Sequence, residues 1–220
     1  TEELLEGFRA LGIAWSCETR ADLLTEERLE AMLRAGCHTV MLGVESASQE
    51  VLDRYRKDLR LERVHQAFAL CRRAGMRTLA HFCLGLPGES RGTLAGAVDL
   101  ALRLDPDFAT FNVAEPMPGT SLHDDAVAAG WIGEEEDCLD NSDSFPVLRG
   151  PDLGPDEVWA VHGQALGRFF LRPSWILRRI LGIRTMHEAL TLLREGLGLL
   201  GRMLVRIREP RAPSSPSRPR

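Results

Sequence analysis

Residues that could bind a ligand follow an apolar run in the stretch 79–90, LAHFCLGLPGES. Leu79–Gly85 predicts a buried strand, and the turn after it contains Gly88 and ends in Glu89. Such a turn exposes backbone groups and adds a carboxylate. In a barrel of parallel strands, loops of this kind form the ligand-binding face. Taken alone, the stretch is better explained as an ordinary strand-to-helix connection. The other predicted strand ends favour the binding interpretation.

Three other predicted strands end in polar groups of the same kind. Strand 13–17 is followed by Glu18-Thr19-Arg20, strand 39–44 by Glu45-Ser46, and strand 108–113 by Glu115–Thr120. The predicted helices that separate the strands are 2–11, 26–34, 49–54, 64–74 and 93–104. This alternation is typical of βαβ units and predicts a parallel sheet. Four strands cannot close a barrel by themselves.

The alternation of side chains within these strands favours a curved sheet with a ligand-holding interior. Val40, Leu42 and Val44 share one face of their strand, whereas the opposite face holds Met41, Gly43 and Glu45. In the strand 79–85, Phe82 and Leu84 lie opposite His81, Cys83 and Gly85 in the same way. A flat sheet covered by helices on both faces should be apolar on both.

The sequence changes character after about residue 125. Residues 126–155 predict an irregular connection that is first acidic and then rich in proline and glycine. Residues 156–208 predict a helical region, with helices at 156–170 and 186–207. The tail 209–220, rich in proline, serine and arginine, predicts disorder.

Composition excludes several functional classes. The net charge of -5 gives no reason to expect a nucleic-acid partner. The five cysteines form no CxxC or CxxxCxxC spacing, and no secretory signal is visible, so we expect cytoplasmic thiols and no metal site. No apolar run is long enough for a membrane span. The first residue, Thr1, lies inside a helical pattern, which indicates a piece of a longer protein or a trimmed start.

The sequence also gives little support for catalysis by a lysine side chain. Lys57 is the only lysine, and it lies in the charged run DRYRKDLR, where we expect it to face solvent. A Schiff-base enzyme needs a lysine inside a pocket. This argues against an aldolase of that type, and the lack of an HxH ligand set argues against a metal-dependent lyase.

The ordered run WSCETRAD, GCHTVMLGVESASQEVLDRYRK, HFCLGLPGES and FNVAEPMPGTSL resembles the second half of a radical S-adenosylmethionine (radical SAM) enzyme. The branch most similar to it carries a cobalamin-binding domain upstream. The resemblance covers residues 1–122 and implies an incomplete (β/α) barrel of six strands. This chain would supply the last four parallel strands, followed by a helical C-terminal region.

The resemblance also implies where the S-adenosylmethionine would bind. Glu45 and Ser46 would hydrogen-bond the ribose and the methionine group, and Arg20 would pair with the methionine carboxylate. An equally weighted alternative is a simple ion pair between Arg20 and Glu45 across neighbouring strand ends. The loop from Pro116 to Gly119 would close over the adenine.

The adenine-binding pattern Gly-x-Ile-x-Gly of the family corresponds to His81, Cys83 and Gly85. Only Gly85 matches, and the turn through Gly88 and Glu89 would complete this part of the site. For His81 itself, a hydrogen-bonded core residue is favoured over a metal ligand. The sequence points to no catalytic residue.

The function implied for the complete protein is reductive cleavage of S-adenosylmethionine at a 4Fe-4S cluster. The resulting 5′-deoxyadenosyl radical would functionalise a C–H bond, with cobalamin-dependent methylation and cyclisation as candidate outcomes. Implied partners are a small-molecule substrate, which could be a lipid or a tetrapyrrole, and an electron donor such as flavodoxin or ferredoxin. The chain as given lacks the cluster cysteines, so we expect it to be inactive alone.

Two alternatives remain open at this point. The chain could be a non-catalytic remnant or a partner module that completes its barrel with another chain. Its arginine-flanked helix 186–208 could line a lipid or tetrapyrrole pocket or touch a membrane surface, although packing against the barrel is the preferred interpretation.

Overall fold

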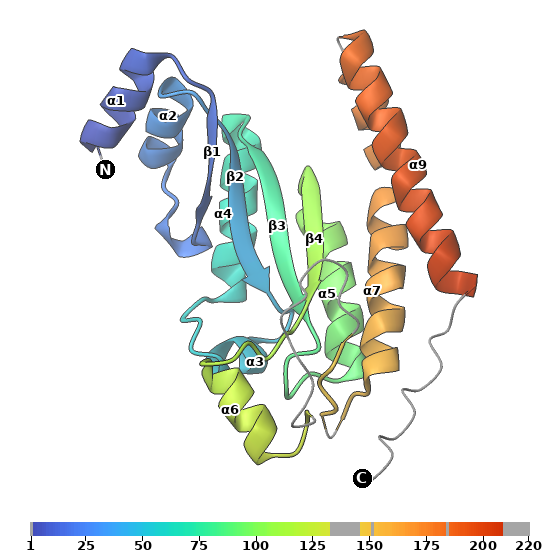
Figure 1. Ribbon diagram of the computed structural model, residues 1–220. Coiled ribbons are helices and arrows are strands. Elements are labelled where there is room, and N and C mark those ends of the chain that lie inside the picture. Colours follow the sequence, from blue (N-terminus) through green and yellow to red (C-terminus); the bar gives the residue numbers. More distant parts are fainter. Residues whose placement is uncertain (1, 133–145, 151, 184, 209–220) are drawn as a thin grey trace. The chain divides into compact units, whose positions relative to one another are not determined.

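A computed structural model describes residues 2–132, 146–150, 152–183 and 185–208, which fall into two compact units, Thr1–Phe169 and Phe170–Arg220. Figure 1 shows the course of the chain. In the first unit the elements are α1 (Glu2–Leu11), β1 (Trp15–Thr19), the short helix η1 (Ala21–Leu23), α2 (Glu26–Arg34), β2 (Cys37–Glu45), α3 (Gln49–Arg54), α4 (Leu61–Ala74), β3 (Arg77–Leu84), α5 (Arg91–Leu104), β4 (Phe108–Val113), α6 (Ser121–Ala128) and α7 (Pro155–Phe170).

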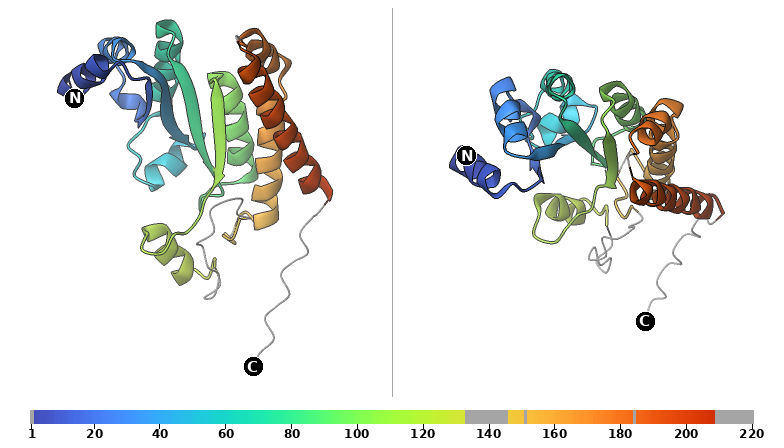
Figure 2. Two further views of the ribbon diagram at one scale, coloured as in Figure 1. Left: turned by 45° about the horizontal axis from the view of Figure 1, so that its top comes forward. Right: turned by 90° about the horizontal axis from the view of Figure 1, so that it is seen from above.

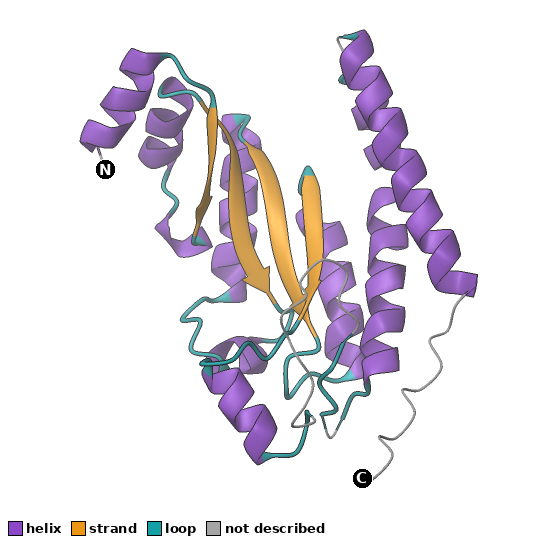
Figure 3. Ribbon diagram, viewed as in Figure 1, coloured by secondary structure: helices purple, strands orange, loops and turns teal. Residues whose placement is uncertain are grey.

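The four strands form one parallel sheet in the order β1-β2-β3-β4. Helices α2, α4 and α5 cover one face of the sheet, as the views in Figure 2 show. Figure 3 shows that all four strands point in the same direction, so their carboxyl ends meet at one edge. This arrangement is an incomplete α/β barrel and confirms the predicted fold.

Burial alternates along the strands as the sequence predicts. The side chains of Val40, Leu42, Val44, Phe82 and Leu84 are completely buried under the helices. Their strand neighbours on the opposite face are only half-buried. Burial of a large apolar side chain contributes about 1.5–3 kcal/mol, so the helix-facing side holds the core. The opposite side, called the free face below, is only partly covered.

The helices begin where the sequence supplies capping groups. The hydroxyl of Thr25 accepts from the backbone N–H of Arg28 and caps α2, which begins where the sequence predicts. Ser90 caps α5 in the same way, and Thr93 returns a hydrogen bond to the backbone of Ser90. This capping box starts α5 at Arg91, two residues earlier than the predicted start.

Some strand bounds differ from the predictions. β1 runs two residues later than expected, because its pairing with β2 continues as far as Thr19. β3 ends at Leu84 and not at Gly85, because Gly85 has a φ of 85°, which a strand residue does not adopt.

Two further helices, at 121–128 and 173–181, were not predicted individually, although the second lies in the predicted helical region 156–208. α6 is capped by Thr120 and extends past the predicted boundary at residue 125. The second unit contains α8 (Pro173–Leu181) and α9 (Met186–Arg208); α8 has Pro173 at its start, where a proline suits a helix.

The predicted division into segments stays a prediction. The structure places the boundary between its two compact units at residue 169/170, and much of the predicted acidic loop (133–145) and the tail (209–220) lie outside the described residues. Within the part of the chain that is described, no helix combines the length and apolar character needed to cross a membrane.

Candidate functional site

A buried hydrogen-bond link joins the carboxyl ends of β2 and β3. The hydroxyl of Ser46 donates to Glu89 Oε1 at 2.8 Å, and both side chains are buried. Glu89 Oε2 accepts from the backbone N–H groups of Gly85 at 2.9 Å and Leu86 at 3.2 Å. Glu89 therefore closes its own loop onto the end of β2, and both of its oxygens are already bonded within the protein.

The same loop is held from a second side. The carbonyl of Pro87 accepts from Arg54 Nη1 at 3.2 Å and from the hydroxyl of Tyr55 at 3.1 Å. The Arg54 guanidinium lies against Gly88, where a Cβ would overlap it. Three hydrogen bonds, from Ser46, Arg54 and Tyr55, thus fix the 85–89 loop relative to the end of β2 and to α3, and the loop backbone is preorganised.

Burial raises the pKa of the Glu89 carboxyl above its ordinary value, although its hydrogen bonds from Ser46, Gly85 and Leu86 favour the charged form. Burial likewise raises the pKa of Tyr55 to about 12. Both groups therefore resist ionisation more than they would in water.

An ion pair stands at the carboxyl end of β2. Lys57 Nζ lies 2.6 Å from Glu45 Oε1, and the two side chains are 37% and 26% exposed. Lys57, expected to face solvent, is only partly exposed, because the chain turns back after α3 and brings its ammonium group to Glu45. A Cβ at Gly43 would lie 2.7 Å from Glu45 Oε1 and 3.5 Å from Lys57 Nζ. The pair therefore lies directly over Gly43, on the free face.

Left-handed backbone places both members of this pair. Glu45 has a φ of 66°, and the residues that flank Lys57, Arg56 and Asp58, have φ values of 49° and 47°. This conformation costs a non-glycine residue about 1–2 kcal/mol. Such outliers gather at functional sites, where the surrounding structure holds them.

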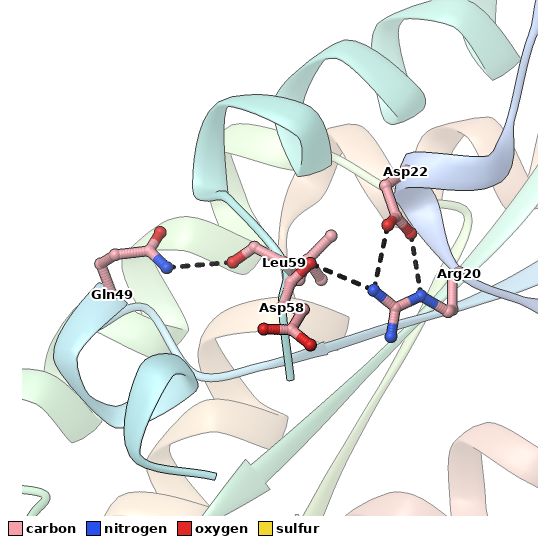
Figure 4. Close-up of polar contacts among 5 residues, drawn as sticks. All are labelled: Arg20, Asp22, Gln49, Asp58 and Leu59. Carbon is pink, nitrogen blue, oxygen red and sulfur yellow. Dashed lines mark hydrogen bonds and ion pairs between the residues drawn. The ribbon is translucent and has the colours of Figure 1, made fainter. Parts of the chain in front are cut away.

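Arg20 makes different contacts from those predicted. Its guanidinium donates through Nε and Nη2 to the carboxylate of Asp22, each at 3.0 Å, and through Nη2 to the carbonyl of Asp58 at 3.1 Å. Figure 4 shows these contacts, beside the hydrogen bond from Gln49 to the carbonyl of Leu59. The expected ion pair between Arg20 and Glu45 is therefore wrong. The bidentate contact raises the pKa of Arg20 and lowers that of Asp22.

His81 lies on the free face in the middle of β3. Its Nδ1 is 2.7 Å from Thr110 Oγ1 on β4, which confirms the prediction of a hydrogen-bonded residue. In the sheet register, Gly43 and Thr110 are its neighbours on either side. Gly43 carries no side chain, and the Glu45 carboxylate takes that position instead.

The segment after β4 folds close to the same edge. Pro116 is buried, and the backbone N–H of Ala114 donates to the carbonyl of Leu84 at 2.8 Å, which continues the pairing beyond the strands. Cys83 and Leu86 pack against the small apolar cluster of Ala114, Ala126 and Leu148. The predicted Pro116 loop is thus anchored next to the 85–89 loop.

The cysteines do not fit an iron–sulfur cluster. In the described ranges, no group of three or more histidine, cysteine or acidic side chains could hold a metal. The four cysteines found there are free thiols, and burial raises the pKa of Cys37 to about 11 and of Cys71 and Cys83 to about 12. Cluster ligands are thiolates, so these thiols would be poor ligands. Cys138 lies outside the described residues.

Comparison with known protein families shows which family the first part of the chain matches. Residues 1–101 match the family model of the radical SAM superfamily. This part of the chain belongs to the radical SAM superfamily. A radical SAM methyltransferase from Kitasatospora setae, solved with cobalamin and a 4Fe-4S cluster, shares the fold with a TM-score of 0.52 at 20% identity. That similarity covers 58% of this chain and 26% of the other.

Two curated relatives extend the comparison with radical SAM proteins. An uncharacterised methyltransferase of Pyrococcus horikoshii is 29% identical over 174 residues, 77% of this chain and 37% of the relative. The anaerobic magnesium-protoporphyrin IX monomethyl ester cyclase of Rubrivivax gelatinosus is 36% identical over 123 residues, 55% of this chain and 22% of the relative. The chain thus spans only 37% of the length of the Pyrococcus relative and 22% of that of the Rubrivivax relative.

The structure brings together most of the predicted radical SAM site residues. Glu45, Ser46 and the residues of the 85–89 loop lie at one edge of the sheet, whereas Arg20 is engaged elsewhere. Their roles in cofactor binding stay predictions. Sequence reasoning missed Lys57, Arg54 and Tyr55, and the one available signal was that the only lysine follows Glu45 by twelve residues.

Proposed function

We propose that this chain forms one wall of the S-adenosylmethionine site in a larger radical SAM enzyme. The observation that supports this proposal is the Glu45–Lys57 pair, which lies over Gly43 at the carboxyl end of the sheet and is placed there by left-handed backbone at Glu45, Arg56 and Asp58. The free end of the methionine group carries one ammonium and one carboxylate. Glu45 can accept from the ammonium, and Lys57 can donate to the carboxylate, so the charges of the pair are complementary to the ligand.

The nucleoside would lie along the neighbouring loops. The backbone of the 85–89 loop and the anchored loop at Pro116 would contact the adenine, as the family resemblance implies. Ser46 and Glu89 are buried and bonded to each other, so we assign them positioning roles instead of direct contact. Their link sets the position of Glu45, which is the residue immediately before Ser46.

The cluster must come from outside the described residues, since the thiols found there do not fit it. S-adenosylmethionine, when bound and reduced at a 4Fe-4S cluster, supplies a 5′-deoxyadenosyl radical. The wall formed by this chain would orient the cofactor and exclude water from it. A flavodoxin or ferredoxin would deliver the electron.

Methyl transfer is the favoured reaction of the complete protein. The methyltransferase relative matches 77% of this chain, whereas the cyclase matches 55%. Cobalamin would take part as the methyl carrier, and the substrate would be a small molecule of lipid or tetrapyrrole type. A cytoplasmic location would suit this chemistry.

Binding of S-adenosylmethionine to the full chain, measured by titration calorimetry, tests the proposal. We expect saturable binding that Glu45→Gln weakens about tenfold or more, because a charge-assisted hydrogen bond contributes about 1.5–3 kcal/mol. The matched control is Glu50→Gln on the exposed side of α3, which should leave binding unchanged. Equal binding by both variants, or no binding by the unsubstituted chain, would contradict the proposal.

A second candidate is a partner module that completes its barrel with another chain. The observation in its favour is that β1 pairs with β2 alone in the four-stranded sheet, so one strand edge is free to pair. Size-exclusion chromatography distinguishes this candidate: a stable monomer that binds S-adenosylmethionine favours the first proposal.

A further inference from the structure

The charge of the chain is divided unevenly between its two units. Residues 170–220 contain eleven arginines and only three glutamates, with no lysine or aspartate. Because the whole chain carries a net charge of -5, residues 1–169 are strongly acidic. A basic segment attached to an acidic body indicates that the segment meets an anionic partner.

The same segment exposes most of the large apolar side chains that are exposed in the described part of the chain. Nine of these fourteen side chains lie between residues 171 and 197. On α8 they are Ile176, Leu177, Ile180 and Leu181, which are 39%, 56%, 53% and 75% exposed. Single exposed apolar residues are ordinary, but a contiguous group marks an interaction surface.

The longest described helix, α9, continues this surface. Met186, Leu190, Leu193 and Leu197 follow a spacing of four, three and four residues, and each is about 60% exposed or more. They form one stripe along the helix. Ala189, Leu192 and Gly196 lie on a different side of α9 and are partly buried, so the more buried side of the helix is not the side that carries the stripe.

Arginines accompany the exposed apolar groups on both helices. Arg178 and Arg179 end α8, and Arg179 lies 5.2 Å from the ring centre of Trp175. On α9, Arg194 is exposed one residue after Leu193. Amphipathic helices that combine arginine with leucine and tryptophan bind in the plane of a lipid interface.

We propose that α8 and α9 form a peripheral binding surface for anionic lipid bilayers. The apolar side chains would enter the boundary between head groups and acyl chains, and the arginines would contact lipid phosphates. One anionic bilayer meets both requirements at once, an apolar layer and a dense negative charge. The surface is built from other residues than the proposed S-adenosylmethionine site, so the inference holds whether or not that proposal is correct.

Vesicle flotation of the full chain tests the inference. Vesicles of phosphatidylcholine with phosphatidylglycerol should carry the protein upward, vesicles of phosphatidylcholine alone should carry much less, and added salt should weaken the binding. Arg178→Gln with Arg194→Gln should reduce the apparent affinity roughly thirtyfold, because each arginine near such a surface contributes a factor of about five. Leu190→Gln with Leu193→Gln should reduce it about tenfold or more.

The matched control is Arg9→Gln with Leu11→Gln on α1, which removes one exposed arginine and one exposed leucine from the other unit. It should bind as the unsubstituted chain does. Circular dichroism of each variant checks that the helices persist. Binding to neither type of vesicle, equal binding to both, or an equal loss in the α1 control would overturn the inference. So would self-association in sedimentation that the α9 variant abolishes, since a second copy would then cover the surface.

Discussion

Lys57 Nζ lies 2.6 Å from Glu45 Oε1, so the only lysine of the chain is paired with the carboxylate that ends β2. If this pair receives the methionine group, Lys57→Met should weaken binding of S-adenosylmethionine about tenfold or more. Arg20→Gln should change the affinity by less than about threefold, because Arg20 already bonds Asp22 and the carbonyl of Asp58. Titration calorimetry on the full chain measures both. A larger loss of affinity from Arg20→Gln than from Lys57→Met would mean that Arg20 binds the methionine carboxylate.

The buried Glu89 should make stability depend on pH. Its pKa is raised in the folded chain, so the folded state favours the protonated form. Its contribution is complete below the ordinary glutamate pKa and is lost as the pH rises through the raised value. We expect the free energy of unfolding to fall over this range by up to about 1.4 kcal/mol per pH unit. Urea unfolding at a series of pH values measures the slope.

Glu89→Gln is the matched comparison for this slope. Glutamine keeps the shape, can accept from Gly85 and Leu86, and does not titrate, so the difference in slope between the two proteins isolates Glu89. Parallel pH profiles for both proteins would show that Glu89 is not the responsible group.

Gly85 should tolerate no side chain. It has a φ of 85°, and an added Cβ would lie 3.0 Å from Val158 Cγ1 and 3.1 Å from Cγ2 on α7. We expect Gly85→Ala to destabilise the chain by about 2–4 kcal/mol, from left-handed backbone and overpacking together. Gly119 has the same φ of 85° with open space around it, so Gly119→Ala should cost only the backbone part, about 1–2 kcal/mol.

Val158→Ala, added to Gly85→Ala, separates the two parts further. The double variant should regain the stability lost to overpacking and keep the loss due to left-handed backbone, as measured by chemical denaturation. No recovery would mean that the backbone conformation alone excludes alanine.

Anaerobic incubation of the chain with iron and sulfide should yield no stable 4Fe-4S absorbance. None of the five cysteines has the CxxxCxxC spacing, and burial keeps the thiols of Cys37, Cys71 and Cys83 protonated at neutral pH. Absorption spectra and iron analysis after desalting measure the outcome. A stable cluster would show that this chain supplies its own ligands and would overturn our proposal that they come from elsewhere.

The sequence by itself determined the fold of the first unit. The alternation of apolar strands and helices required a parallel sheet, and the two-residue period of Val40, Leu42 and Val44 identified its buried face. Caps such as Thr25 were readable because a hydroxyl at a helix start bonds the backbone three residues away. These features depend on neighbours close in sequence, so residue types reveal them.

Only the tertiary structure decided which charges meet. Arg20 and Glu45 end adjacent strands, yet each has a different partner, because left-handed residues at 56 and 58 turn the chain and carry Lys57 back over Gly43. The sign of φ at a residue such as Arg56 or Glu45 cannot be read from its type. Likewise Glu89 resembled a free carboxylate in sequence, and its burial against Ser46 depends on two strands packing side by side. Pairing between distant side chains is a property of the assembled backbone, since each charge takes the nearest partner that the fold brings to it.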